Sequence, residues 1–538
     1  MKRRRFLTLA AAAGLTPALR AQQAPENPPG EPPPPPPASP APESPPAAPE
    51  SPPPQTPAAV PSPEIAPPSA PQAATAPEPP LPAPEPAAPT PAPEPAPPAP
   101  GPVPPTPSPA ATQITQPVTC AVVGGRLIDG SGGPPLADSV ILISGERILA
   151  IGTQGAMTVP EGVETVSTEG LTVLPGLWDM AVHLTRLGYP DTRRWDETYL
   201  PLAERIIAPA AALQLLHAGV TTVRDVASPL DEALAVRDRI RSHRLVGPRV
   251  YVGGPALEHD PPPSTRSYRW PVANPANAKE LTNRLIKAGV DYVTVAGLDS
   301  LPAADLSEIV AFSHAARLKV EAIIRHDADI ERALEAQVDG LIGLGDGGGD
   351  LPPGALAALE ARARRGEPAV IAPALSPLVN YEWLRENAEP LDDPAWRADL
   401  PPIVATDLRD SLADLSGLAV EYNMPAVRLP GQGARLRQVR DAGALLVIGS
   451  DAGVPAHLLP RATWQEVESW VREAGFTPLE ALRHASYWPA VAMGVQYEAG
   501  TVTAGKFADI LAVRGDVLRH IDRLSDVEVV IQRGRRIR

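Results

Sequence analysis

The order of apolar and polar residues changes character along the chain. From Cys120 onward, short runs such as CAVVGGRLIDG and SVILISGERILAIG alternate apolar with polar residues and are separated by glycine and proline. A period of two residues with turn residues between the runs is typical of β-strands joined by turns. The same pattern returns near the C-terminus in GTVTAGKFADILAVRGDV and VEVVIQRGRRIR. We therefore expect residues 118–176 and 498–538 to combine into a small β-sandwich domain.

Between these two segments, residues 177–497 show a strand followed by a helix, repeatedly. Amphipathic stretches such as LAERIIAPAAALQLLHAG and AKELTNRLIKAG predict the helices. Eight strands alternating with helices predict an α/β fold, a (β/α)8 TIM-like barrel. The proline-rich segment between the seventh strand and Arg435 is predicted to be an insertion or lid over the ends of the strands. The predicted strands are Trp178–Leu184, Val220–Asp225, Arg249–Gly253, Asp291–Val295, Lys319–Ile324, Gly340–Leu344, Ala369–Pro373 and Leu445–Ser450.

Composition sets the N-terminal region apart from this globular part. Of the 74 prolines in 538 residues, 41 lie between Pro25 and Pro109. Proline fixes φ and removes a backbone donor, so residues 23–117 are predicted to be a disordered linker rich in Pro, Ala and Glu, with polyproline II character. The linker is either a solvated spacer or a segment that meets a partner in the cell envelope, and the residues leave both alternatives open.

Residues 1–22 have the order of an export signal peptide. Lys2 to Arg5 are cationic, Phe6 to Leu15 are apolar, and a small residue, Ala21, follows. The stretch RRRFL resembles the twin-arginine motif, and an arginine-rich general secretory signal is the alternative. Because no later stretch reaches the ~18 unbroken apolar residues of a transmembrane helix, we expect an exported, periplasmic or extracellular protein without a membrane span.

Charge and cysteine content exclude several classes of partner and site. The formal net charge is −15 and aromatic residues make up 4% of the chain, which argues against nucleic acid as a partner because phosphate binding needs a basic face. The single cysteine, Cys120, excludes an intrachain disulfide and the Cys-rich zinc frameworks. A small-molecule ligand or substrate remains the expected partner, and the oligomeric state stays open.

Several segments carry a resemblance to a known family. The segments are GGRLIDGSGG at 124–133, LTVLPGLWDMAVHL at 171–184, HAGVTTVRDV at 217–226, GPRVYVGG at 247–254, GVDYVTV at 289–295, IERALEAQVDGLIG at 330–343, IGSDAGVP at 448–455 and AGKFADILAV at 504–513. Together they resemble the metal-dependent amidohydrolase superfamily, in particular its imidazolonepropionase and prolidase-like branch, over nearly all of residues 118–538. The resemblance implies a hydrolase of carbon–nitrogen bonds, in a cyclic amide or a dipeptide, with a divalent metal at the carboxyl ends of the barrel strands.

The resemblance also implies where metal ligands belong, and most of those positions carry other residues here. The family pattern needs His-x-His on the first strand, a carboxylated Lys or a Glu on the fourth, a His on each of the fifth and sixth, and an Asp on the eighth. His183 and Asp451 match it as residual metal positions and as a candidate catalytic pair. Catalytic zinc normally takes three protein ligands, so we expect no cofactor, or a divalent metal such as zinc at low affinity. The other positions hold Ala181, Thr294, Ile323 and Gly343.

Three further residues are candidate substrate-binding residues near the strand ends. Arg325 lies two positions after Ile323, on the same face of the strand, and is predicted either to pair with Asp451 or an anionic ligand or to face solvent. His259 and His457 lie on loops that follow strands and could bind substrate, replace metal ligands or be surface residues. Asp451 itself could instead cap a helix. His217, His314 and His484 fall in helical stretches and are predicted to be structural.

Two main functions remain open, and a third is weaker. The protein is either a weakly active amidohydrolase or binding pseudoenzyme with a degenerate metal site, or an active hydrolase with an atypical mononuclear metal site that recruits other ligands. A purely structural envelope protein would explain the linker but not the retained Asp451. The losses concentrate at ligand positions while the strand and turn segments are intact, which favours the first hypothesis.

Overall fold

The computed structural model describes residues 116–386, 397, 399–415, 418 and 425–538. The predicted signal peptide at 1–22 and all but the last two residues of the predicted linker at 23–117 lie outside this range, so both stay predictions. Among the described residues, no helix combines the length and the apolar content that a membrane crossing requires.

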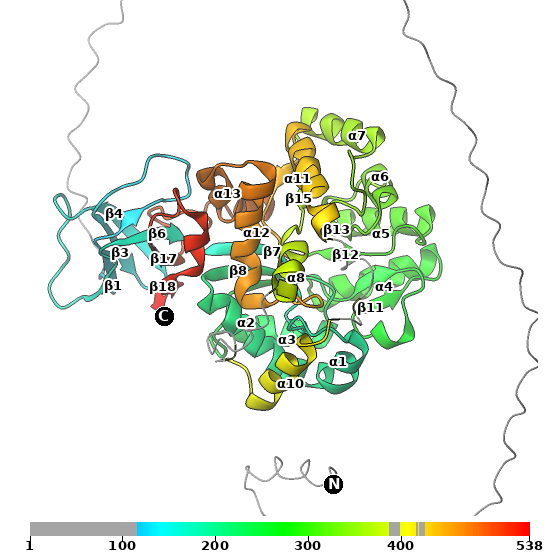
Figure 1. Cartoon of the computed structure of the whole chain (residues 1–538), viewed down its shortest axis with the longest axis horizontal. Helices are drawn as coiled ribbons and strands as arrows, with labels where there is room; N and C mark the ends of the chain where they lie inside the picture. The colour runs from blue at the N-terminus through cyan, green and yellow to red at the C-terminus, as the bar shows by residue number, and fades with distance from the viewer. Residues whose placement is uncertain (1–115, 387–396, 398, 416–417, 419–424) are drawn as a thin grey trace, which may run out of the picture. The chain divides into compact units, whose positions relative to one another are not determined.

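The first described region consists of two β-sheets built from both ends of the chain (Figure 1). One sheet has the strand order β4-β3-β1-β5 and the other β19-β18-β17-β6-β2. β17 pairs antiparallel with β6, with Ile510 opposite Pro175, so the C-terminal segment joins the N-terminal strands. The strands are β1 Cys120–Val123, β2 Arg126–Leu127, β3 Ser139–Ser144, β4 Arg147–Thr153, β5 Glu164–Ser167, β6 Leu171–Pro175, β17 Ile510–Arg514, β18 Val527–Gln532 and β19 Arg535–Arg536.

One apolar core joins these two sheets. Val122 and Ile141 of the first sheet share it with Val173, Ile510 and Val529 of the second, and all are at most 4% exposed. The alternating pattern places every second side chain of a strand on the same face, which is why the period of two residues in the sequence produces this shared core.

The second region contains parallel strands at all eight predicted positions, within the part of the chain that the structure describes. It is a mixed α/β region, and the strands are shorter than predicted at several ends. They are β7 Leu177–Val182, β8 Val220–Asp225, β9 Arg249–Val252, β12 Val293–Val295, β13 Val320–Ile323, β14 Gly340–Ile342, β15 Val370–Ala372 and β16 Leu445–Leu446.

These strands are divided between two sheets. β7, β8 and β9 form one sheet, and β11-β10-β12-β13-β14-β15-β16 form the other. The division falls after β9, the third predicted strand, where Gly253 and Gly254 follow, the latter with φ +69°. The chain resumes as β10 (Ala256–Glu258), which pairs with β12 and with β11 (Arg269–Pro271). The sequence did not predict β10 or β11.

Backbone hydrogen bonds also join β7 to the segment that follows β16. The Met180 N–H donates to the Ile448 carbonyl at 2.9 Å, and the Asp451 N–H donates to the Ala181 carbonyl at 2.8 Å. An isolated parallel bridge pairs Val182 with Ala452. The first and eighth predicted strands therefore lie side by side.

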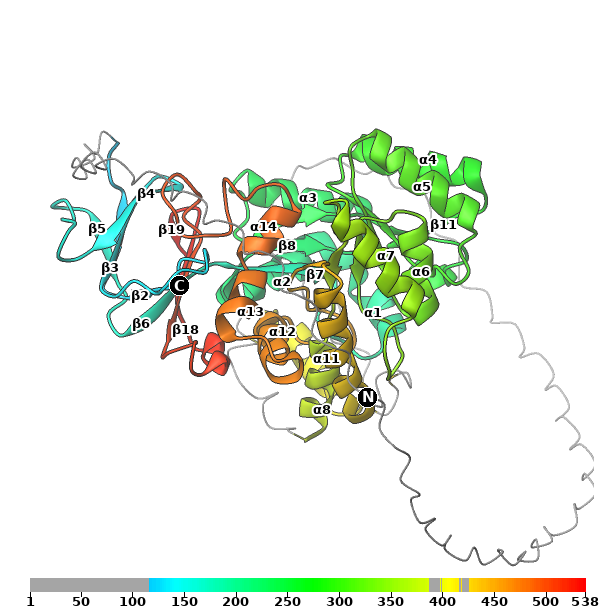
Figure 2. The same cartoon turned by 90° about the horizontal axis from the view of Figure 1, so that it is seen from above.

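Helices lie outside the parallel strands, as Figure 2 shows. Their apolar faces pack in one large core with outward-facing strand residues such as Val293, Val295 and Ala322. The helices are α1 Thr192–Thr198, α2 Ala208–His217, α3 Leu230–Arg241, α4 Pro275–Ala288, α5 Ala303–Ala315, α6 Asp327–Glu335, α7 Pro353–Arg364, α12 Leu459–Ala474, α13 Pro478–His484 and α14 Tyr487–Ala492.

The predicted insertion between the seventh and eighth strands contributes helices α8 (Ser376–Glu386), α10 (Pro402–Leu412) and α11 (Pro425–Asp441). The α10 residue Asp407 accepts hydrogen bonds from the hydroxyls of Tyr189 and Tyr199, which follow β7. The insertion therefore contacts the loop after the first strand.

Candidate functional site

The structure brings His183 and Asp451 together at the carboxyl ends of β7 and β16. His183 Nε2 lies 2.9 Å from Asp451 Oδ1, and the two side chains are 11% and 29% exposed. Both residues are fixed through their backbones, because the His183 N–H donates to Ala452 and the Asp451 N–H donates to Ala181. The two strands thus place this pair, which we call the His183–Asp451 dyad.

The environment of the dyad favours a charged Asp451. Burial alone would raise the pKa of Asp451, but the hydrogen bond from His183 and the positive potential of nearby groups, Arg325 among them, hold the pKa below its ordinary value. An ionised carboxylate only accepts hydrogen bonds, so His183 Nε2 carries the proton of this contact. Asp451 can therefore orient the His183 imidazole and balance a positive charge on that ring.

Asp451 does not have the helix-capping role that was the alternative. The next helix, α12, begins at Leu459 with Leu458 at its N-cap. Asp451 instead has a positive φ of +57°, a conformation that costs a non-glycine residue about 1 kcal/mol or more. The surrounding hydrogen bonds hold this strained turn in place.

Two buried carboxylates that sequence reasoning missed hold the backbone around the dyad. Asp179 accepts hydrogen bonds from the Ser450 N–H and hydroxyl and from the Thr463 hydroxyl. Asp225 accepts one from the Leu184 N–H, directly after His183, at 2.9 Å. Burial raises the pKa of Asp225 to about 6, although that hydrogen bond opposes the shift. Asp225 lies in the segment HAGVTTVRDV, and its position as a carboxylate at the end of a predicted strand could have marked it as a candidate site residue.

Arg325 lies in the loop between β13 and α6 and is exposed. Its positive charge is one of the causes that lower the pKa of Asp451, but no ion pair within 4.0 Å joins these two described residues. The structure therefore places Arg325 within electrostatic range of the dyad without direct contact, and its role as a substrate-binding residue stays a prediction.

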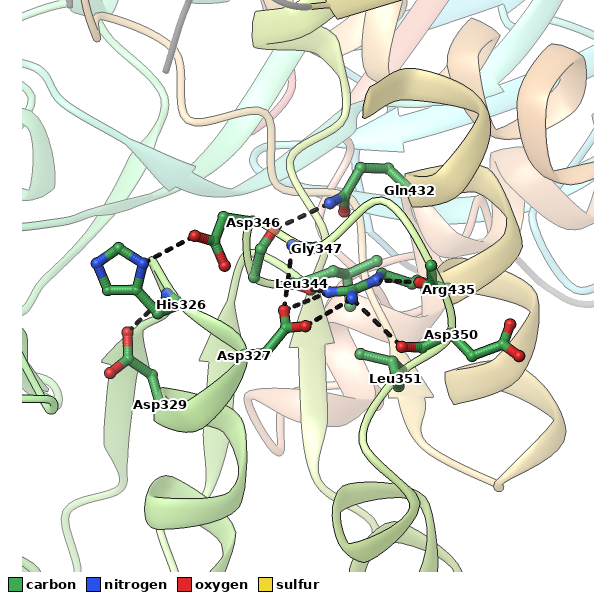
Figure 3. A network of polar contacts seen from close by, with 12 residues as sticks. His326, Asp327, Asp329, Leu344, Asp346, Gly347, Asp350, Leu351, Gln432 and Arg435 are labelled. Carbon is green, nitrogen blue, oxygen red and sulfur yellow. Dashed lines mark hydrogen bonds and ion pairs between the residues drawn. The ribbon is translucent and has the colours of Figure 1, made fainter. Parts of the chain in front are cut away.

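The loop that carries Arg325 is clamped by the insertion. Arg435 of α11 is 1% exposed at its side chain and binds both carboxylate oxygens of Asp327, at 2.5 and 2.7 Å. The same guanidinium donates to the backbone carbonyls of Leu344 and Gly349 in the loop after β14 (Figure 3). Because all three nitrogens of this guanidinium donate hydrogen bonds, Arg435 fixes the loops after the fifth and sixth strands against α11.

The two candidate histidines lie apart from the dyad side chains. His457 is fully buried, and its Nδ1–H donates to the backbone carbonyl of Asp451 at 3.3 Å. Burial lowers the pKa of His457 to about 4, so the ring is neutral, and its Nε2 has no hydrogen-bond partner among the described residues. The Nδ1–H of His259, which follows β10, donates to the Val272 carbonyl at 3.0 Å. Their binding roles stay predictions.

Beside the dyad, the ends of the strands form an apolar cluster, which we call the strand-end layer. Its members come from or directly follow β7, β8, β10, β12 and β14, and each is at most 4% exposed. Ile323 at the end of β13 packs against it. Sequence reasoning named Ala181 and Ile323 but missed the rest. The buried members are Ala181, Val226, Ala227, Ala256, Ala296 and Ile342.

Below the strand-end layer lies a buried ion pair that the sequence analysis did not predict. Arg224 of β8 and Glu321 of β13 are 2.6 Å apart and 2% exposed. The Arg224 guanidinium also lies over the Tyr292 ring, 5.1 Å from its centroid. A Cβ at Gly340 would come within 2.1 Å of Glu321 Oε2, so this glycine makes room for the carboxylate. The only sequence signal for this ion pair was the alternation of side chains along the predicted strands, which places every second residue on the same face.

Thr294 and Gly343 occupy different environments. Thr294 is fully buried on β12, and its hydroxyl has no hydrogen-bond partner among the described residues. Gly343 follows β14 with φ +97°, and a Cβ there would lie 2.8 Å from the Ile324 carbonyl oxygen. Any side chain at position 343 would therefore be strained in this backbone.

The donors at the strand ends can be compared with what a metal ion requires. Across the described segments, no group of three or more His, Cys, Asp or Glu side chains could hold a metal ion. The dyad supplies one imidazole and one carboxylate, and these are hydrogen-bonded to each other.

Comparison with known proteins relates this chain to one superfamily. The family model described as "Amidohydrolase family" matches residues 408–537. An imidazolonepropionase from Symbiobacterium thermophilum is 25% identical over 485 residues, which cover 78% of this chain and 98% of the relative.

Solved structures show the same fold. A putative prolidase from Bifidobacterium longum is 22% identical, with a TM-score of 0.59 over 78% of this chain and 95% of that chain. A Xaa-Pro dipeptidase with bound methionine is 22% identical, with a TM-score of 0.58 over 78% and 99%. Molinate hydrolase is 20% identical, with a TM-score of 0.60 over 78% and 94%.

Proposed function

This chain belongs to the amidohydrolase superfamily, and from that premise we propose that it is a member whose metal centre has been replaced, so that it binds a small molecule at the dyad with little or no metal-dependent hydrolysis. The observation that carries the proposal is the strand-end layer. Where metal ligands would converge from several strands, Ala181, Ile323 and their neighbours are packed against one another.

The residues at these strand ends do not fit a catalytic zinc ion. Such an ion takes three protein ligands and keeps an open position for water. Thr294 cannot supply a bridging carbamate, and a ligand at position 343 would meet the Ile324 carbonyl. No reaction step through a metal follows from this donor set.

The dyad and Arg325 support a binding role for an anionic or polar group. Asp451 holds His183 by one ring nitrogen, which leaves Nδ1 as the ring nitrogen available to a ligand. Arg325 adds an exposed positive charge on a loop that Arg435 and Asp327 hold in place. An anionic group at Arg325 with a donor facing His183 would satisfy both side chains.

The full architecture and location form part of the same proposal. The hydrogen bonds between β7 and the segment after β16 support closure of the strands into a (β/α)8 barrel, with the two β-sheets as a sandwich domain over 118–176 and 498–538. We also propose export, on the basis of the signal-like residues 1–22, with residues 23–117 as a tether.

A hydrolase assay tests this function. The full-length chain is assayed with a Xaa-Pro dipeptide and with imidazolonepropionate, with excess zinc or manganese, beside a metal-loaded prolidase. Losing water activation by a metal removes several kcal/mol of transition-state stabilisation, so we expect turnover at least about a thousandfold lower than the comparator and insensitive to chelator. Metal-dependent turnover within about tenfold of the comparator, lost in Asp451→Asn, would contradict the proposal.

One observation favours a second candidate function. His183 and Asp451, both positions at which the family holds metal, are retained side by side at 2.9 Å. An active hydrolase with an atypical mononuclear site would use these two residues as metal ligands together with another, recruited ligand. Metal-dependent turnover in the assay described above would support this second function.

A further inference from the structure

A cavity lies at the opposite ends of the strands from the dyad. It has a volume of about 290 Å³ and is formed where β16 begins, beneath helices α13 and α14. Both residues of β16 line the cavity, whereas Asp451 of the dyad lies five residues beyond the carboxyl end of that strand. The lining residues are Ala444, Leu445, Leu446, Glu480, Arg483, His484 and Trp488.

Arg483 brings a positive charge to this cavity. Its guanidinium lies 5.4 Å from the ring centroid of Tyr487 and 5.2 Å from that of Trp488. Its Nε is buried with no hydrogen-bond partner, and no carboxylate lies within 4.0 Å, among the residues that the structure describes. An arginine that lies beside two neighbouring aromatic rings and has an unpaired Nε–H is suited to a planar carboxylate.

The carboxylate that lines the cavity has another role. Glu480 Oε2 accepts hydrogen bonds from the Thr477 N–H at 2.8 Å and from the Thr477 hydroxyl at 2.7 Å. Thr477 is the N-cap of α13, so Glu480 completes a capping box. It therefore stabilises the helix and does not neutralise Arg483 by direct contact.

His484 offers a hydrogen-bond acceptor to the same cavity. Its Nδ1–H donates to the Leu446 carbonyl at 2.8 Å, so Nε2 is the ring nitrogen left for a ligand. Burial lowers the pKa of His484 to about 4, which keeps the ring neutral and Nε2 an acceptor. The ring also stacks with Trp488, with centroids 6.2 Å apart and planes at 26°. His484 was predicted to be structural, and this geometry adds a second role.

We propose that this cavity binds a small planar aromatic acid that carries a ring N–H or O–H donor. The carboxylate pairs with the Arg483 guanidinium, the donor meets His484 Nε2, and the ring packs against the Trp488 indole. The volume is at the lower end of ligand cavities, which suits one or two fused rings. This site is independent of the function proposed for the dyad.

Ligand-observed NMR and calorimetry with indole-5-carboxylate test the proposal on the full-length chain. We expect a Kd of about 1 mM or tighter, and binding at least about tenfold weaker for indole-5-carboxamide, which has the same shape without the charge. Arg483→Gln should weaken binding of the acid about tenfold, and Trp488→Leu should weaken both probes. Thermal melts confirm that the variants are folded.

Two controls separate this site from the rest of the molecule. Arg519→Gln removes an 83% exposed arginine elsewhere and should leave binding unchanged, as should His183→Ala in the dyad. Absence of binding by the acid, equal binding of acid and amide to the unmodified protein, or loss of binding in His183→Ala would each overturn the assignment.

Discussion

The two sides of the strand ends have opposite chemistry. On the side of β7 and β16, the His183–Asp451 dyad is polar and is held by backbone hydrogen bonds between neighbouring strands. At the ends of β12, β13 and β14 the side chains are apolar and packed, with Ile323 and Ile342 in the strand-end layer, which Ala181 of β7 also joins. We propose that the apolar side no longer supplies metal ligands, while the polar side keeps the geometry of the dyad.

The apolar side is supported from below by a charged pair, and breaking it should have the largest effect. Arg224→Met leaves Glu321 buried without its partner, so we expect the free energy of unfolding to fall by about 3–5 kcal/mol. Chemical denaturation measures this change. Replacing both residues with Met should recover most of the loss, because two apolar side chains need no pairing.

A matched control is the exposed pair Arg364–Glu360 of α7, where Arg364→Met should lower the free energy of unfolding by about 0.5 kcal/mol or less.

The Arg224→Met variant should also change how stability depends on pH. Burial already raises the pKa of Glu321, with Arg224 opposing the shift. In Arg224→Met the folded state therefore binds a proton more readily than the unfolded state, and the variant should be relatively more stable at pH 5 than at pH 7. A loss below about 1 kcal/mol would show that the pair is not buried as described.

On the polar side, His457 should make stability depend on pH. Its pKa is lowered to about 4 by burial, so the unfolded state binds the proton first as the pH falls. The stabilising contribution of the neutral ring is present above about pH 6.5 and is lost as the pH falls toward 4, by about 3 kcal/mol. The difference between the unmodified protein and His457→Gln, measured by denaturation across this range, isolates the effect. A difference independent of pH would contradict the buried, neutral assignment.

Gly343 tests whether the backbone directly after β14 can accept a side chain. Gly343→Ala should cost about 1–2 kcal/mol for its left-handed backbone and more for the Cβ contact with the Ile324 carbonyl oxygen. Gly366 has φ +77° and no heavy atom within 4 Å of the place where a Cβ would lie, so Gly366→Ala is the control that reports the backbone term alone. Equal losses in the two variants would show that this carbonyl does not restrict position 343.

The smallest effect is expected at the dyad. Asp451→Asn keeps the shape of the partly exposed side chain and removes a charge-assisted hydrogen bond, so we expect a loss of about 1 kcal/mol at neutral pH. Because the pKa of Asp451 is lowered, the carboxylate stabilises the fold above its unfolded pKa of about 3.9, and the difference from Asn should vanish as the pH falls through the folded pKa. A difference that grows at low pH would contradict this assignment.

Much of the fold could be predicted from the sequence, because local patterns determine the elements. The alternating runs and the strand–helix repeats gave the strand positions, and β8 matches its prediction at both ends. The separate strand β10 after Gly253 and Gly254 was not predicted, since it depends on its pairing with β12, while β9 pairs with β8.

The site was only partly predictable, for a similar reason. The motif residues His183 and Asp451 could be found one by one, but the strand-end layer depends on residues such as Ala256 and Ala296, which carry no chemical signal. The Arg435–Asp327 contact joins residues 108 positions apart, so no local pattern indicates it.

Elemental analysis of the full-length protein tests the central claim most directly. The protein is expressed with zinc, iron and manganese in the medium and purified without chelator, beside a metal-loaded prolidase, and bound metal is measured by mass spectrometry. The packed strand-end layer and the two-residue donor set predict well under about 0.1 metal ions per chain after dialysis. About one or two ions per chain, reduced in His183→Ala and Asp451→Asn, would contradict the account.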